Sequence, residues 1–166
     1  MTRVEKDLQK VVKLLSEVLG NAYFEGYRFD TSFTLRFGRS DFDNFKKQSL
    51  PLTIELYLLG EWWFHTEEEW AGKLSMLKSS GTFDLEEPLQ AFALTHLRWC
   101  DNSEVYSVSL ENEILEIRFK NEYQLRISCM PVEGESWILV GNYAQGKEDK
   151  LSVTCEGGEY YINDPQ

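Results

Sequence analysis

The sequence predicts an α+β fold: a mostly antiparallel, curved β-sheet with an N-terminal amphipathic helix and a short second helix packed on it. Short stretches of alternating apolar and polar residues indicate strands with one buried face. Apolar residues at helical spacing near the N-terminus indicate the amphipathic helix. The length of 166 residues suits a single domain over residues 1–166, which can bury a core without metals or disulfides.

A helix is expected at about residues 3–19. Thr2 and Glu5 match a capping box at its start. Gly20 and Asn21 are residue types that end helices in a left-handed conformation. Six aliphatic residues recur at helical spacing between these signals: Leu8, Val11, Val12, Leu15, Val18 and Leu19.

The first strand block covers about residues 23–64. A polar loop from Gly38 to Leu50 divides it. Alternating apolar residues predict strands on both sides of this loop, and a short aromatic run ends the block: Tyr27–Phe29, Phe33–Phe37, Leu52–Leu58 and Trp62–Phe64.

The second helix is expected at about residues 67–79. Thr66 and Glu69 fit a capping box, and acidic residues in a first turn suit the positive end of the helix dipole. Thr82–Pro88 is expected to be a loop. The next stretch, Leu89–Trp99, is compatible with a strand or a helix, and we predict an extended conformation.

The second strand block covers about residues 90–162 and contains the clearest strand pattern, Tyr106–Cys129. Three alternating runs in this stretch are joined by two short polar links centred on Asn, which tolerates tight turns. They predict a three-stranded meander. Three further strands are expected after it: Trp137–Val140, Leu151–Cys155 and Tyr160–Ile162.

The two strand blocks resemble each other. FTLRF at residues 33–37 aligns with LEIRF at 115–119, and LTIEL at 52–56 aligns with LRISC at 125–129. A two-fold internal repeat is one interpretation. The other is a chance likeness, since strand–turn–strand patterns are generally alike.

Composition and motifs disfavour several classes of function. The net charge of −11 repels phosphate backbones and anionic lipid and attracts basic partners, so we expect neither a nucleic-acid nor a membrane partner. No metal-ligand spacing, nucleotide loop or hydrolase motif occurs, so we predict no enzyme activity, no metal and no cofactor. Acid–base catalysis by a carboxylate pair, such as Asp41 and Asp43, would require a raised pKa.

The cysteines and the N-terminus suggest a compartment. Cys100, Cys129 and Cys155 are an odd set without C-x-x-C spacing, and Cys129 falls on the apolar side of its strand. We therefore expect a buried free thiol there. Charges interrupt every apolar run near the N-terminus, unlike a signal peptide. We predict a cytoplasmic location.

Recognition of a basic protein is the favoured function. The segment Gly60–Trp70 sets tryptophans beside glutamates, and aromatic anchors ringed by charge suit an interface. The alternative places these tryptophans in the core and the glutamates at a helix N-terminus. A second acidic feature is the run from Asp101 to Glu116, with Glu111 and Glu113, which would mark one end and the wet face of the meander. The candidate contact residues come from Gly60–Trp70 and from the start of this run: Trp62, Trp63, Glu67, Glu68, Glu69, Asp101 and Glu104.

The run LRWCDNSEVYSVSLENEILEIRFKNEYQLRIS, followed by ESWILVGN, resembles uncharacterised small stand-alone bacterial domains. Such proteins often look like the cytoplasmic immunity proteins of toxin systems, which are small, acidic and non-catalytic. The resemblance covers about residues 94–142, with a looser match over 27–63. It implies an immunity or antitoxin-like inhibitor of a basic enzyme such as a nuclease. It transfers no functional residue, because its pattern consists of alternating apolar positions.

Two further functions stay open. A small-ligand domain, for instance for carbohydrate, would stack sugars on Trp62, Trp63, Trp99 or Trp137. A structural protein would pair through sheet edges, and the sequence is compatible with a monomer or a homodimer. Exposure of the tryptophans and the distribution of the acids would separate these functions.

Overall fold

The computed structural model describes residues 3–39, 50–81, 86–130, 133–143 and 150–165. The Thr2 cap and most of the two loops predicted at 38–50 and 82–88 lie outside these residues. The elements are, in chain order, α1 (Arg3–Leu19), β1 (Tyr23–Phe29), β2 (Phe33–Gly38), β3 (Thr53–Leu58), β4 (Trp62–Phe64), α2 (Glu67–Ser79), α3 (Glu87–Trp99), β5 (Val105–Glu111), β6 (Ile114–Phe119), β7 (Gln124–Ser128), β8 (Glu135–Asn142), β9 (Lys150–Glu156) and β10 (Glu159–Asn163).

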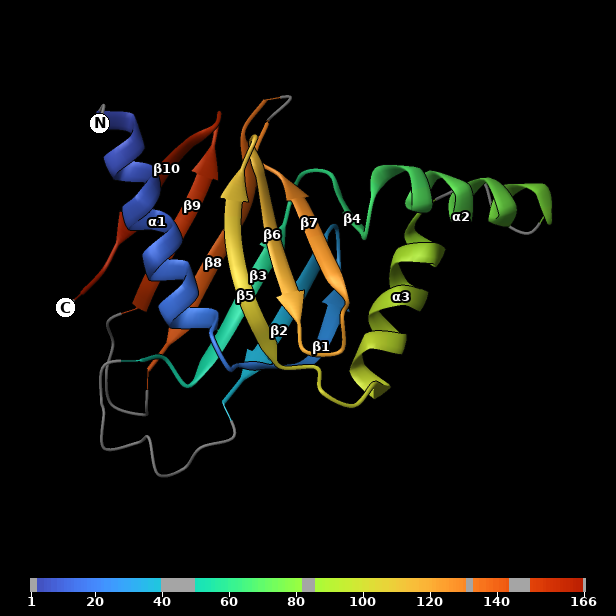
Figure 1. The fold of residues 1–166 in the computed structure, drawn as a ribbon, viewed down its shortest axis with the longest axis horizontal. Coiled ribbons are helices and arrows are strands. Elements are labelled where there is room, and N and C mark those ends of the chain that lie inside the picture. The colour runs from blue at the N-terminus through green and yellow to red at the C-terminus, as the bar shows by residue number, and fades with distance from the viewer. Residues whose placement is uncertain (1–2, 40–49, 82–85, 131–132, 144–149, 166) are drawn as a thin grey trace.

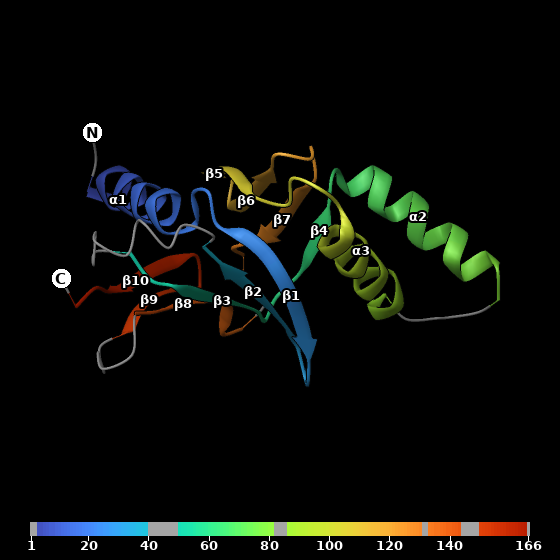
Figure 2. The ribbon, with the colours of Figure 1, turned by 90° about the horizontal axis from the view of Figure 1, so that it is seen from below.

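The α+β class and the antiparallel pairing are confirmed, and the described strands form two sheets. Sheet A has six strands in the order β1-β2-β3-β8-β9-β10, and sheet B has four in the order β4-β7-β6-β5. Figures 1 and 2 show sheet B lying as a second layer over sheet A. Sheet A combines β1, β2 and β3 of the first block with β8, β9 and β10 of the second, and sheet B combines β4 of the first block with β5, β6 and β7 of the second.

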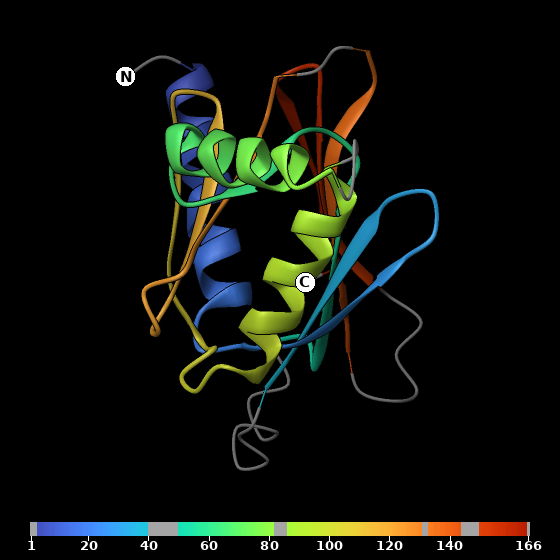
Figure 3. The ribbon, with the colours of Figure 1, turned by 90° about the vertical axis from the view of Figure 1, so that its right-hand side faces the viewer.

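Apolar side chains fill the space between the two sheets. Phe33 of β2 packs edge-on against Trp62 of β4 with ring centroids 5.2 Å apart, and Phe37 stacks on Phe119 of β6 at 6.3 Å. The helices close the sides of this sandwich. α1 contacts β5 and β10, and α3 contacts β1, so that α3 covers the side of the molecule that faces the viewer in Figure 3.

α1 forms where the sequence predicts it and buries one face of the helix, with Leu15 and Leu19 fully buried. Asn21 takes the expected left-handed conformation, with φ 59°. The guanidinium of Arg39 donates hydrogen bonds to the carbonyl oxygens of Gly20 (3.0 Å), Glu17 (3.2 Å), Val18 and Pro51. These carbonyls include those that the end of the helix leaves without an intrahelical partner.

The extended conformation predicted for Leu89–Trp99 is wrong, because this stretch belongs to α3. Its helical period is carried by Gln90, Leu94 and Leu97, which are buried on one face. Phe92, whose alternation with Leu94 suggested a strand, is 70% exposed on the other side. A proline in the first turn, where no backbone donor is needed, helps to start the helix.

The two halves of the chain repeat one arrangement of elements. In each half a helix precedes three antiparallel strands, and a fourth strand leaves to join the other sheet. β4 of the first half pairs with β7, and β8 of the second half pairs with β3. The helices are exchanged in the same sense, because α1 packs on β5 and α3 on β1. The fold therefore contains a two-fold pseudo-repeat, to which α2, β9 and β10 are added.

Backbone hydrogen bonds are reciprocal where the two halves meet. The amide of Phe24 donates to the carbonyl of Ser103 at 3.1 Å, and the amide of Val105 donates to the carbonyl of Ala22 at 2.7 Å. Each bond is the counterpart of the other under the pseudo-repeat. The backbone bridge between Tyr23 and Glu104 lies between them, where the two-fold axis must pass.

The same irregularity occurs in both halves. β1 bulges after the pair Phe24–Phe37, and β5 bulges after the pair Val105–Phe119. Phe37 and Phe119 are therefore equivalent, as the alignment of FTLRF with LEIRF predicts. The β5 bulge also shifts the expected alternation, so that Val105 is buried and Tyr106 is 72% exposed.

The second predicted alignment is displaced by four residues. Leu35 pairs with Leu56, and its equivalent Ile117 pairs with Leu125. The counterpart of Leu56 is therefore Leu125, whereas the alignment of the sequences set it against Cys129. Alternating strands look alike at every even shift, so only the strand pairing reveals the correct register.

Candidate functional site

The tryptophans predicted to contact a partner lie inside the fold. Trp62 and Trp63 of β4 are only 4% and 7% exposed, and the Trp62 ring packs on those of Phe33 and Phe64. The interpretation that places them in the core is therefore correct, and their rings are not offered to a partner. Trp99 is 78% exposed and is the tryptophan that remains accessible to a ligand.

The three glutamates beside these tryptophans form the first turn of α2. Thr66 and Glu69 make the predicted capping box, with the Glu69 amide donating to the Thr66 hydroxyl at 3.2 Å. Hydrogen bonds from the Thr66 backbone and side chain lower the pKa of Glu69. Glu67 and Glu68 are exposed and favour the helix through its dipole. Local helix formation accounts for this acidic cluster.

The predicted residues do not form one surface. The Trp70 indole of α2 donates a hydrogen bond to Glu86 at the start of α3, whereas Asp101 and Glu104 follow the end of α3. A helix of 13 residues is about 20 Å long and separates the two acidic groups. Glu104 is also paired with Lys120, which neutralises part of the charge.

A different set of glutamates gathers where the chain crosses between the two sheets, at the upper end of the sandwich in Figure 1. They come from the connections β3–β4, β5–β6, β7–β8 and β9–β10 and from the strand ends beside them. We call this surface the acidic end. Its seven exposed glutamates are Glu61, Glu111, Glu113, Glu133, Glu135, Glu156 and Glu159.

Strand pairing forces three of these carboxylates together. Glu156 is the cross-strand partner of Glu135 on one side and of Glu159 on the other. Gly157 and Gly158 make the tight turn between β9 and β10 with φ of 61° and 75°, a geometry that sets the flanking residues directly opposite one another. Directly opposed like charges destabilise a sheet, so folding alone does not account for this row.

Backbone hydrogen bonds hold the connections of the acidic end against one another. The Ser128 amide donates to the Glu61 carbonyl at 2.9 Å, and the Cys129 amide donates to the Glu113 carbonyl at 2.8 Å. The Gly60 amide donates to the Ser136 carbonyl at 2.8 Å. These bonds link the described parts of both crossovers to the β5–β6 turn.

The charge of the acidic end is uncompensated within these connections. Residues 59–61, 111–114, 129–135 and 156–159 contain no Lys or Arg. Elsewhere several carboxylates are paired with arginines: Glu25 with Arg36, Glu55 with Arg28, and Glu116 with Arg118 and Arg126. Two apolar side chains accompany the glutamates, Leu59 at 42% and Met130 at 55% exposure. Acids around apolar contacts suit a basic protein surface.

The two buried thiols are poorly placed for a reaction. Cys129 and Cys155 are fully buried free thiols, as expected for Cys129. Hydrogen bonds from Cys155, Trp137 and Tyr160 lower the pKa of Cys129 to about 6, but neither sulfur is accessible to a substrate. Within the described ranges, no group of three His, Cys, Asp or Glu side chains could hold a metal ion. Asp41 and Asp43 lie outside those ranges.

Comparison of the chain with protein-family models, with curated proteins and with solved structures finds no match. Among the described helices, none combines the length and the apolar character needed to cross a membrane. Function is therefore inferred from the surface of the molecule itself.

Sequence reasoning singled out Glu111 and Glu113 within the acidic run Asp101–Glu116. It missed the other five glutamates of the acidic end, because they are scattered over the connections β3–β4, β7–β8 and β9–β10. The local signal was present in the E-G-G-E run at 156–159 and the E-N-E run at 111–113. Acids on both sides of a predicted two-residue turn must face each other in the hairpin. That rule identifies glutamates whose position works against folding.

Proposed function

We propose that this chain is a non-enzymatic protein-binding domain that uses its acidic end to hold a basic partner protein. An immunity or antitoxin-like inhibitor of a basic enzyme, acting in the cytoplasm, is the specific form of this proposal. The observation that supports it is the set of seven exposed glutamates at one end of the sandwich, whose connections contain no Lys or Arg. Glu156 is opposed by glutamates on both sides and destabilises the fold. Its role would be to attract a cationic partner.

The two features of the acidic end would contribute to binding differently. Uncompensated charge steers a basic partner and raises its association rate by a factor of about 10 to 1,000 at low ionic strength. Leu59 and Met130 supply apolar area for contacts that slow dissociation. Methionine is flexible and polarizable, which suits it to a surface that must adapt to a partner.

The test compares two variants with the same change in net charge. The first replaces Glu135, Glu156 and Glu159 by Gln and removes the row of opposed acids. The matched control is Glu67→Gln, Glu68→Gln, Asp101→Asn, which removes the acids that the sequence singled out. Immobilised wild type and both variants are incubated with native cell extract at low and high salt, and bound proteins are quantified by mass spectrometry.

The proposal expects a basic protein that wild type and the control retain, that the first variant loses by at least about tenfold, and that high salt releases. Equal retention by all three proteins would contradict it. Loss in the control alone would assign binding to the α2–α3 side of the molecule, and the acidic end would then have no role.

A further inference from the structure

A pocket of about 480 Å³ lies on the outer face of sheet B, the layer nearest the viewer in Figure 1. We call it the sheet B pocket, and its volume is within the range of small-molecule sites. Along β6, Leu115, Ile117 and Phe119 are buried in the core. Glu116 and Arg118 alternate with them and therefore face outward. The floor of the pocket consists of the outward side chains of paired strands.

A buried glutamate forms the centre of this floor. Glu116 is 9% exposed and lies between Ser109 of β5 and Arg126 of β7, its two cross-strand partners. Its carboxylate accepts a hydrogen bond at each oxygen, one from Nε of Arg118 and one from Nε of Arg126 at 2.8 Å. Charge-assisted bonds at both oxygens compensate the burial of this carboxylate.

The two arginines keep most of their donors for a ligand. A guanidinium has five N–H donors, and Arg118 and Arg126 each give Nε–H to Glu116. Their terminal nitrogens donate to no protein atom within the part of the chain that the structure describes. Both side chains line the pocket. Two guanidiniums on one carboxylate leave this network with a net charge of +1.

Neutral polar groups of the pocket lie beside these charges. The hydroxyls of Ser107 and Ser109 come from β5, where the two residues pair with Arg118 and Glu116. Asn112 of the β5–β6 turn adds a side-chain amide to the same lining. Hydroxyls and amides both donate and accept hydrogen bonds, as the recognition of a hydroxylated ligand requires.

The two ends of the pocket differ in charge. Glu111, beside the β5–β6 turn, repels an anion and accepts hydrogen bonds from hydroxyls. Arg118 lies towards the other end of β6, and the exposed ring of Tyr106 lines the pocket as well. A ligand with its anionic group at the arginines and its hydroxyls at the turn therefore fits both ends.

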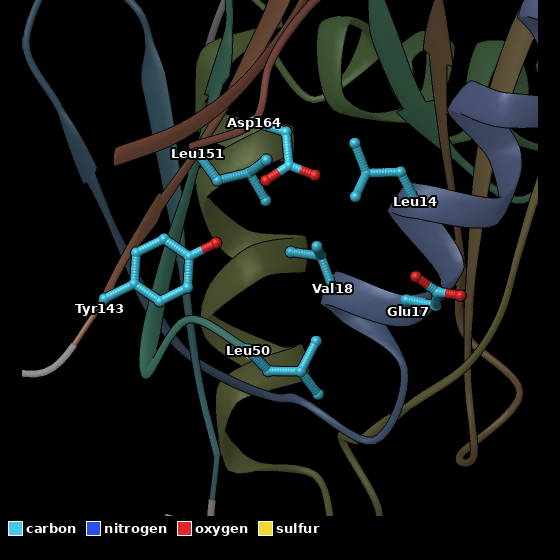
Figure 4. A pocket seen from close by; sticks show the side chains of 7 residues that line it. All are labelled: Leu14, Glu17, Val18, Leu50, Tyr143, Leu151 and Asp164. Carbon is cyan, nitrogen blue, oxygen red and sulfur yellow. The ribbon is translucent and has the colours of Figure 1, made fainter. Parts of the chain in front are cut away.

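The pocket between α1 and sheet A has a different character. Its volume is about 340 Å³, and Leu14, Val18 and Leu151 form aliphatic walls (Figure 4). Among the described residues that line it there is no Lys or Arg. An anion is therefore attracted to the sheet B pocket rather than to this one.

We propose that the sheet B pocket binds a sugar acid, with its carboxylate at the terminal nitrogens of Arg118 and Arg126. Its hydroxyls exchange hydrogen bonds with Ser109, Asn112 and Glu111. The guanidinium fork matches a carboxylate in shape, and the charge of +1 matches a single negative charge. A doubly charged phosphate ester is disfavoured, because the whole chain carries a net charge of −11.

The ligand is either a free sugar acid or the acidic residue of a glycan, which present the same carboxylate and hydroxyls. This inference goes beyond the proposed function and does not rest on it. Glu111 is the residue that the pocket shares with the acidic end. Binding of a small molecule to the purified chain and capture of a basic protein can therefore fail separately.

The test is a titration of the ¹⁵N-labelled full chain with D-glucuronate at fixed ionic strength, followed by amide chemical shifts. We expect saturable binding with a dissociation constant on the order of 1 mM and the largest shifts at Ser107, Ser109, Arg118 and Arg126. Acetate carries the charge without the hydroxyls, and D-glucose carries hydroxyls without the charge. Each should bind at least about tenfold more weakly than D-glucuronate.

Variants separate the geometry of the pocket from its charge. Arg118→Gln should weaken D-glucuronate binding at least about tenfold. Arg118→Lys keeps the charge but not the planar fork and should also weaken it several-fold. The matched control Arg36→Gln removes an arginine that is paired with Glu25 on sheet A and should leave the affinity unchanged. Ser109→Ala leaves the ion pairs intact and should weaken binding about threefold.

The methyl glycoside of D-glucuronate distinguishes the two sources of the ligand. Retained affinity would indicate the acidic residue of a glycan, because the anomeric oxygen then tolerates a substituent. Loss of affinity would indicate a free sugar acid.

Three results would overturn the proposal. The first is shifts that do not saturate and that spread over basic residues of both sheets, which would indicate unspecific anion binding. The second is equal affinity for acetate, which would leave no role for the hydroxyls. The third is wild-type affinity in Arg118→Gln with a dispersed spectrum, or an equal loss of affinity in Arg36→Gln.

Discussion

Replacing Glu156 should stabilise the fold, because this residue is opposed by Glu135 and Glu159 on the two neighbouring strands. Two carboxylates about 6 Å apart in water repel by about 0.7 kcal/mol, so two such neighbours cost about 1.4 kcal/mol at low salt. Side chains that splay apart relieve part of this. We expect Glu156→Gln to raise the free energy of unfolding by about 1 kcal/mol and Glu156→Lys, which turns repulsion into attraction, by about 2 kcal/mol.

Urea unfolding at 10 mM and 500 mM NaCl measures both the gain and its origin. The Debye length falls from about 30 Å to about 4 Å over this range, so the gains should shrink several-fold at high salt. At low salt, the free energy of unfolding must be highest for Glu156→Lys, intermediate for Glu156→Gln and lowest for wild type. Unchanged or lower stability of Glu156→Lys, or a gain that ignores salt, would refute the reasoning that these carboxylates oppose folding.

Three other properties can be checked on the same protein. Arg39→Ala should lower the free energy of unfolding in urea by about 2 kcal/mol, because four carbonyls lose a charged donor. The control Arg36→Ala removes an exposed ion pair with a carboxylate and should lower it by less than about 1 kcal/mol. Equal losses in the two variants would contradict this. Burial, and next the Lys73 charge, lower the pKa of His65 below its ordinary 6.5. Stability from neutral His65 is therefore present above pH 6.5 and lost as pH falls through the lowered value, so His65→Gln should flatten the pH dependence of urea midpoints there; an unchanged slope would argue against it. An aromatic disulfide reagent should modify Cys100 in the native state and the two fully buried thiols only on unfolding; rapid reaction of all three would show an open core.

Strand positions could be predicted from sequence because most strands have one buried face and one wet face. The meander of β5, β6 and β7 follows directly from alternation, and its β5–β6 link turns through Asn112 at φ 50° as expected. In the β6–β7 link the left-handed residue is Glu122 rather than Asn121. A polar residue type therefore located the turn without fixing which residue takes the positive φ.

The exchange of β4 and β8 between sheets could not be read from the sequence. Each strand carries tryptophan near its start, Trp62 in β4 and Trp137 in β8. Trp62 pairs opposite Ile127 and Trp137 opposite Leu58, contacts that depend on packing across the whole molecule. The same exchange buries Trp62. In the sequence, tryptophans beside glutamates suggest an exposed interface, because the sequence does not show that the strand moves into the other sheet.

The acidic character of the candidate site could be predicted from the sequence, but its location on the fold could not. Net charge and the lack of catalytic motifs lead from the sequence to the hypothesis of a basic partner. Where the acids gather depends on which turns lie at the same end of the sandwich. Glu61 and Glu113 become neighbours of the β7–β8 connection only through hydrogen bonds to Ser128 and Cys129, which no local pattern encodes.

The central claim is that the acidic end receives a basic protein, and the association rate tests it most directly. Stopped-flow measurements with the purified captured partner, from 50 to 500 mM NaCl, compare wild type with the variant that has Gln at 135, 156 and 159. We predict that the wild-type rate constant falls at least about tenfold over this range and that the variant is slower at low salt with a flatter dependence. Identical rates and salt slopes for the two proteins would contradict the account.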